Sequence, residues 1–75
     1  MKKIKYEHSK ELTKGTMLYD EANGQTYEIT SDGFDYFHRW YDCKVYEWDS
    51  ETEEDVCIDD KYRLTEHDVV GKYIM

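Results

Sequence analysis

The stretch that most constrains the fold is residues 34–48, because seven of its fifteen residues are aromatic. Leu, Ile, Val and Phe together supply only 13 of the 75 residues, and the net charge is −8. Such a composition is typical of disordered chains. The eight Tyr and two Trp indicate a folded chain instead, since each can bury ~150–250 Å² of surface. We therefore expect one folded domain, residues 1–75, with a core built largely on the rings of residues 34–48.

Two periodicities compete at the start of this aromatic stretch. Every second residue from Phe34 to Trp40 carries a ring, as in a strand, whereas Phe34, Phe37 and Tyr41 recur at helical spacing. Aromatic residues favour strands, and Asp32-Gly33 is a hairpin-turn signal. The sequence therefore predicts a turn at Asp32-Gly33 followed by a strand. A helix over residues 33–42 is the alternative.

A second hairpin is predicted around Asn23-Gly24, which lies between two expected strands, residues 16–20 and 25–30. A two-residue turn would place Leu18 opposite Ile29, whereas a three-residue loop would shift the pairing by one. A shift of one residue exchanges the buried face of a strand. Tyr27 and Ile29 are expected to be buried in both registers, and Val45 is expected to be buried in a later strand.

The remaining patterns predict further short strands and tight turns. Thr65 and Asp68 have the spacing of a capping box, which predicts a helical turn near the C-terminus, and Ser9 is a candidate N-cap for a turn over residues 9–15. Asp59-Asp60 is expected to be a turn. Together these strand and turn patterns predict a mainly β domain, either a small SH3-like barrel or a strongly bent antiparallel sheet of five or six short strands. An α+β sheet with residues 33–42 helical is the alternative. Further strands are expected at residues 44–48, 56–58, 62–64 and 73–74, and the alternation of Ile4, Tyr6 and His8 with charged residues predicts a short edge strand or an ordered arm.

The negative charge is concentrated in residues 49–60, which contain seven acids and no Lys or Arg. The rest of the chain has eleven acids against ten Lys and Arg, so it carries only −1. A solvated hairpin tip explains such a run without any function. A negative patch that meets a basic partner is the functional explanation, since such patches steer association. A calcium loop is not indicated, because Glu54 stands where an EF-hand needs glycine. The predicted contact residues are Asp49, Glu51, Glu53, Glu54, Asp55, Trp40, Tyr46 and Trp48.

His38, Cys43, Cys57 and His67 could together supply a Cys2His2 zinc site. Their spacing lacks the short chelating pair of most structural zinc sites. The sequence therefore predicts no metal and no cofactor, but two buried, reduced thiols and two surface imidazoles.

The function classes that the sequence disfavours are numerous. No catalytic motif, nucleotide loop or apolar run of membrane-spanning length is present. Residues 15–48 carry seven acids against Arg39 and Lys44, so the aromatic region lacks the basic groove that nucleic acid needs. No apolar run follows Lys5, which predicts no signal peptide and a cytoplasmic location.

The sequence therefore predicts a non-enzymatic protein-binding or inhibitory module. Its expected partner is a protein with a basic surface, such as a DNA- or RNA-binding host protein blocked by a phage or mobile-element protein. The alternative is a structural accessory domain, including a homo-oligomer whose strand edges pair.

Overall fold

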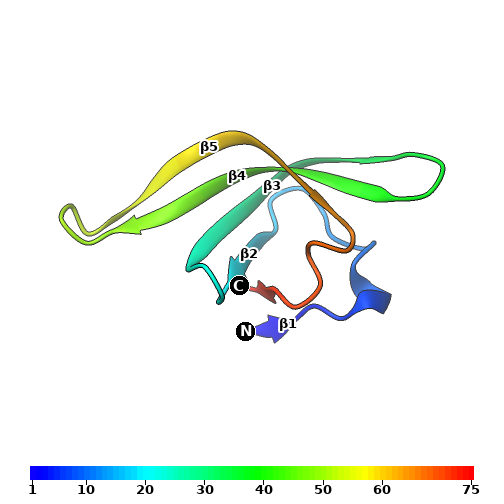
Figure 1. Cartoon of the computed structure of the whole chain (residues 1–75), viewed down its shortest axis with the longest axis horizontal. Coiled ribbons are helices and arrows are strands. Elements are labelled where there is room, and N and C mark those ends of the chain that lie inside the picture. The colour runs from blue at the N-terminus through cyan, green and yellow to red at the C-terminus, as the bar shows by residue number, and fades with distance from the viewer.

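Six antiparallel strands form one sheet in the computed structural model, which describes residues 1–75 (Figure 1). The order across the sheet is β1-β6-β2-β3-β4-β5, so β1 and β5 are its two edges and the sheet does not close. The predicted mainly β fold is confirmed, and because the sheet is open it corresponds to the predicted bent antiparallel sheet and not to a closed SH3-like barrel. The elements are β1 (Lys2–Lys3), the 3₁₀ helix η1 (Tyr6–His8), β2 (Met17–Asp20), β3 (Gln25–Phe34), β4 (Arg39–Asp49), β5 (Glu54–Thr65) and β6 (Tyr73–Ile74).

The three long strands β3, β4 and β5 form two hairpins whose turns point to opposite ends of the molecule (Figure 1). The strand prediction at the start of the aromatic stretch is confirmed, and the helical alternative over residues 33–42 is wrong. The turn predicted at Asp32-Gly33 is also wrong, because both residues lie within β3. The chain turns at Asp35, whose Oδ1 accepts the backbone N–H groups of Phe37 (2.9 Å) and His38 (2.8 Å).

The β2–β3 hairpin has a four-residue loop, residues 21–24, that differs from both predicted loops. Leu18 pairs with Tyr27, whereas a two-residue turn would pair it with Ile29. The observed register is therefore shifted by two residues. A shift of two residues keeps each side chain on its original face. Leu18, Tyr27 and Ile29 are accordingly buried, as that register predicts. Gly24 adopts φ 69°, and its N–H donates to the Asp20 carbonyl oxygen at 2.8 Å.

Strand β5 runs unbroken through Asp59 and Asp60, so the turn predicted there is wrong. Cys43 pairs with Tyr62 and Val45 pairs with Asp59, which leaves an extra residue on β5. The Asp59 carboxylate accepts the backbone N–H of Lys61 at 2.9 Å within this bulge. Bulges bend a strand without ending it, which accounts for the curvature of the β4–β5 hairpin.

The core lies under the middle of the sheet, where the N- and C-terminal segments cover it (Figure 1). Only Tyr41 of the seven rings of residues 34–48 is buried, so the predicted aromatic core is wrong. The hairpins extend beyond the short terminal segments, and the rings near their ends therefore have nothing to pack against. Tyr27, Ile29 and Val45 are buried, as predicted. The ten core residues are Ile4, Leu12, Leu18, Tyr27, Ile29, Tyr41, Cys43, Val45, Leu64 and Val69.

Turns replace most of the expected helix in the terminal segments. The capping-box contacts are present, since the Thr65 N–H donates to Asp68 Oδ2 (2.9 Å) and the Asp68 N–H donates to Thr65 Oγ1 (3.2 Å). The turn does not continue into a helix. The turn predicted with Ser9 as N-cap is wrong, because Ser9 follows η1 and its Oγ donates back to the Tyr6 carbonyl oxygen at 2.7 Å. With η1 its one helix, the structure offers no helix of a length and apolarity suited to crossing a membrane.

Candidate functional site

The acidic segment forms the free end of the β4–β5 hairpin, which we call the acidic arm and define as residues 47–58. Its turn, residues 50–53, contains Glu53 with a left-handed φ of 54°. The Asp49 carboxylate accepts the backbone N–H of Glu51 at 2.9 Å, which fixes the start of the turn. Every residue from position 50 to position 60 is exposed. The charge therefore belongs to a turn and to the adjoining half of an edge strand, with no core beneath them.

The predicted contact residues do not lie on one face. Successive side chains of a strand point to opposite faces. Trp40, Tyr46 and Trp48 therefore lie on the face of β4 that points away from the core, which we call the outer face. Asp49 shares the other face with buried Val45. Trp48 pairs with Asp55, and Asp49 pairs with Glu54. Trp40 is eight residues before Trp48, a separation of about 26 Å along a strand. Only Trp48 is thus brought together with the acids.

Two apolar residues of β5 belong to the acidic arm, although the sequence prediction omitted them. Val56 and Ile58 are 42% and 49% exposed, and Trp48 is 60% exposed. Val56 pairs with Glu47 and therefore lies on the face opposite Trp48, but all three side chains border one shallow hollow of about 360 Å³ whose remaining side chains are polar. Strand alternation in Val56-Cys57-Ile58 was the signal that could have identified this patch. The polar members of the hollow are Glu47, Asp49, Ser50 and Glu51.

The outer edge of β5 has no neighbouring strand in the sheet. Residues 54–63, ten of the twelve in the strand, are exposed. An unpaired edge presents backbone N–H and C=O groups that another extended chain can pair with. The acidic arm therefore combines carboxylates, apolar side chains and a free backbone edge.

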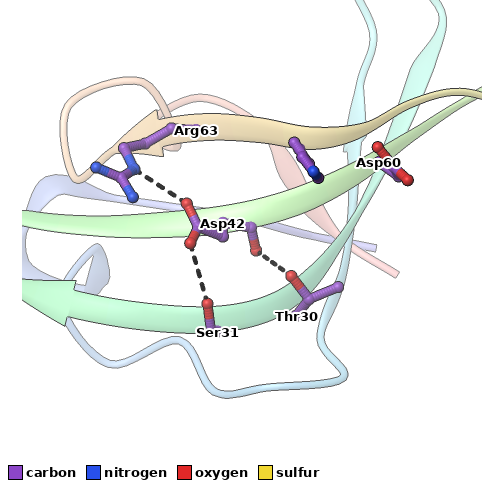
Figure 2. Close-up of a pocket in the computed structure, with 6 residues that line it drawn as sticks. Thr30, Ser31, Asp42, Asp60 and Arg63 are labelled. Carbon is purple, nitrogen blue, oxygen red and sulfur yellow. Dashed lines mark hydrogen bonds and ion pairs between the residues drawn. The ribbon is translucent and has the colours of Figure 1, made fainter.

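The middle of the outer face is a polar cluster centred on Asp42 (Figure 2). Asp42 lies between neighbours on both adjacent strands, since Oδ1 accepts from Arg63 Nε (3.0 Å) and Oδ2 accepts from Ser31 Oγ (3.2 Å). The Thr30 hydroxyl donates to the Asp42 carbonyl oxygen at 3.0 Å. The hydrogen bond from Arg63 is the main cause that lowers the pKa of Asp42. This cluster ties β3, β4 and β5 together, because its polar groups satisfy one another.

Two of the predicted contact rings are held within the domain. The Arg63 guanidinium stacks on the Trp40 ring, with its central carbon 3.9 Å from the ring centroid. The Tyr46 hydroxyl donates to Glu28 Oε1 at 3.0 Å, and this bond is the main cause that raises the pKa of Tyr46. Both rings are only half-buried. They are therefore less available as partner anchors than Trp48.

The β3–β4 turn lies at the opposite end of the molecule (Figure 1), and it carries a second exposed apolar surface. Phe34, Tyr36 and Phe37 are exposed, with Tyr36 at 95%. These rings were expected in the core, because periodicity shows which side of a strand is apolar and not how far a hairpin projects.

The cysteines and histidines do not assemble as one set. Cys43 is buried and Cys57 is exposed, so the prediction of two buried thiols is wrong for Cys57. Burial is the main cause that raises the pKa of the Cys43 thiol to about 11. His38 and His67 are both exposed, as predicted, but they lie beside each other and beside Glu66.

The acidic arm is thus the region of the molecule where charge, apolar exposure and a free strand edge coincide. Comparison of the chain with protein-family models, with curated proteins and with solved structures finds no match in any of the three.

Proposed function

We propose that this protein is a non-enzymatic binding module that engages a partner with a basic surface through its acidic arm. The observation that carries the proposal is the concentration of charge −7 in residues 49–60 around exposed Trp48, Val56 and Ile58. A hairpin turn that served only to keep the protein soluble would not need these apolar side chains, whose exposure to water costs free energy.

The two kinds of side chain have different roles in this proposal. The carboxylates attract a basic surface over about one Debye length, so they govern the association rate and its dependence on salt. Trp48, Val56 and Ile58 are desolvated on contact and govern the dissociation rate, since buried aromatic side chains are the usual anchors of interfaces. Pairing of the β5 edge with an extended segment of the partner would fix their orientation.

The partner that best fits is a protein whose basic groove binds DNA or RNA. A row of carboxylates on an exposed strand occupies such a groove in place of phosphates, because the basic side chains of the groove recognise negative charge. Blocking a host protein in this way is the role that we assign to the module in a phage or a mobile element.

A structural accessory role, with two β5 edges pairing between copies, is the second candidate. The unpaired edge and exposed Val56 and Ile58 favour it. The charge opposes it, because self-pairing brings two arms of −6 into contact. A concentration-dependent dimer at low salt, measured by analytical ultracentrifugation, would support this candidate over the first.

The test compares three proteins as bait in a lysate of the cell from which the gene comes. The arm variant carries Glu51→Gln, Glu53→Gln and Glu54→Gln. The control variant carries Glu7→Gln, Glu11→Gln and Glu21→Gln, three exposed acids outside the acidic arm, so both variants lose the same charge. We expect the wild-type and control proteins to capture the same basic protein and the arm variant to lose it. Equal capture by all three proteins would contradict the proposal.

A further inference from the structure

Three potential metal ligands that are distant in the sequence meet beside the β3–β4 turn. His38 belongs to that turn, whereas Glu66 and His67 begin the turn after β5. The Glu66 N–H donates to the Arg39 carbonyl oxygen at 2.9 Å, which fastens the two segments together. His38 Nδ1 lies 3.4 Å from Glu66 Oε1, and His67 Nε2 lies 3.9 Å from the same oxygen. One ligand atom from each of the three side chains lies within 4.8 Å of the other two.

The two carboxylate oxygens of Glu66 have separate surroundings. Oε1 faces both imidazoles. Oε2 accepts the Arg39 backbone N–H at 3.3 Å and lies 3.8 Å from Lys10 Nζ. The side chain is only 2% exposed, so this orientation is fixed by packing. One oxygen is therefore anchored by the protein while the other is presented to the two histidine rings.

We infer that His38, Glu66 and His67 form a binding site for Zn²⁺ or a chemically similar divalent transition metal. In a tetrahedral zinc site with bonds of about 2.0–2.1 Å, neighbouring ligand atoms are about 3.3 Å apart. The His38–Glu66 distance of 3.4 Å already meets this requirement, and the His67–Glu66 distance of 3.9 Å does so after a small rotation of an exposed ring. Three protein ligands leave the fourth position to water on the solvent side.

The donor set selects the class of metal. Two imidazole nitrogens suit zinc, copper, nickel and cobalt, whereas Ca²⁺ and Mg²⁺ prefer oxygen ligands alone. The Tyr6 ring stacks on the His67 ring, with centroids 5.6 Å apart and an interplanar angle of 26°, and it helps to orient that ligand. The positive charge of Lys10 opposes a cation nearby, so it sets the affinity below that of a closed structural site.

This site does not depend on the proposed function of the acidic arm, and its test uses purified protein. A Cys57→Ser background removes an exposed thiol that could bind metal by itself. Protein stripped of metal with a chelator is titrated with Co²⁺, whose visible absorption reports its coordination, and then with Zn²⁺ in competition. Thermal melts are recorded in parallel. At zinc 100-fold above its dissociation constant we expect the melting temperature to rise by roughly 10–20 °C.

The variants are His38→Asn and His67→Asn, with His8→Asn as the matched control. All three histidine side chains are about half exposed, so the exchanges leave the core intact. We expect one equivalent of zinc to bind the parent and the His8→Asn protein, and binding to weaken at least about 10–100-fold in the other two. Lys10→Gln should strengthen binding. Equal zinc affinity in the parent, His38→Asn and His67→Asn proteins would overturn the inference, as would no binding by the parent at millimolar zinc.

Discussion

Replacement of Gly33 by Ala tests the packing of the outer face directly. Gly33 pairs with Trp40 across β3 and β4, and the indole covers the glycine. A Cβ atom on residue 33 would lie 1.9 Å from Trp40 Cζ2 and 2.3 Å from Cη2. These distances are impossible, so the ring must move away. The ring then loses its stacking contact with the Arg63 guanidinium, whose central carbon lies 3.9 Å from the ring centroid.

The cost follows from what the ring loses. Losing an exposed cation–π contact costs about 0.5–1 kcal/mol. Exposing about 50–100 Å² of a half-buried indole costs roughly 1–2.5 kcal/mol at ~25 cal/mol per Å². Ala gains about 0.5–1 kcal/mol over Gly in a strand interior. We therefore expect Gly33→Ala to lower the free energy of unfolding by about 0.5–3 kcal/mol.

The same substitution should have the opposite sign once the ring is absent. In a Trp40→Ala background nothing collides with the new methyl group, so Gly33→Ala should raise the free energy of unfolding by about 0.5–1 kcal/mol. The assay is urea unfolding of the four proteins of a double-mutant cycle, followed by circular dichroism. If Gly33→Ala costs the same amount with and without Trp40, the placement of the indole over the glycine is refuted.

Three further predictions concern the core and the two cysteines. Ile29 is fully buried, so Ile29→Ala should cost about 2–5 kcal/mol in urea unfolding; an unchanged midpoint would place Ile29 outside the core. Exposed Cys57 should react with a thiol reagent at once, whereas buried Cys43 should react only on unfolding; equal rates would contradict the assigned faces. Because burial raises the pKa of Cys43 from 9.0 to about 11, its neutral thiol stabilises the fold fully below pH 9, and this stability is lost as the pH rises toward 11. Cys43→Ala should flatten that part of the profile of melting temperature against pH.

The sequence was informative about the strands, because their signals are local. Asn23-Gly24 correctly marked a hairpin, and the pairing of residues 44–48 with Val56 and its neighbours follows from the turn between them. Burial of Tyr27 and Ile29 was predictable because it holds in every register that keeps the apolar face inside.

The errors have a common cause, which is that tertiary contacts decide between equivalent local signals. Asp32-Gly33 has the composition of a turn, but Trp40 covers the glycine and the Asp32 carboxylate pairs with Arg39, so the dipeptide remains in the strand. Asp35 makes the turn instead. Bulges in β5 likewise absorb Asp59-Asp60 without reversing the chain.

Of the two candidate sites, the one formed by contiguous residues could be predicted from the sequence, and the one formed by tertiary contacts could not. The run of acids in residues 49–60 is visible in the sequence, because it is contiguous. The meeting of His38 with Glu66 and His67 is not visible, since it depends on the β4–β5 register and on how the chain turns after Thr65. Exposure of Phe34, Tyr36 and Phe37 depends on how little chain is left to cover a long hairpin.

The acidic arm should be dispensable for folding and necessary for association. Exposed charges rarely contribute more than ~1 kcal/mol each to stability, and like charges at this density repel. The Glu51→Gln, Glu53→Gln and Glu54→Gln variant should therefore unfold at the wild-type urea concentration or slightly above it. Trp48→Ala should raise the dissociation rate from the partner, because the proposed function makes this ring an anchor of the interface.

The most direct test is the association rate of the captured partner with the wild-type protein and with this arm variant, each at low salt and at ~1 M salt. The Debye length falls to ~3 Å at 1 M, so electrostatic steering is almost removed there. The proposal predicts that the arm variant associates several-fold more slowly at low salt and that the two rates converge at high salt. Equal rates for both proteins at both salt concentrations would contradict the assignment of the acidic arm as the binding surface.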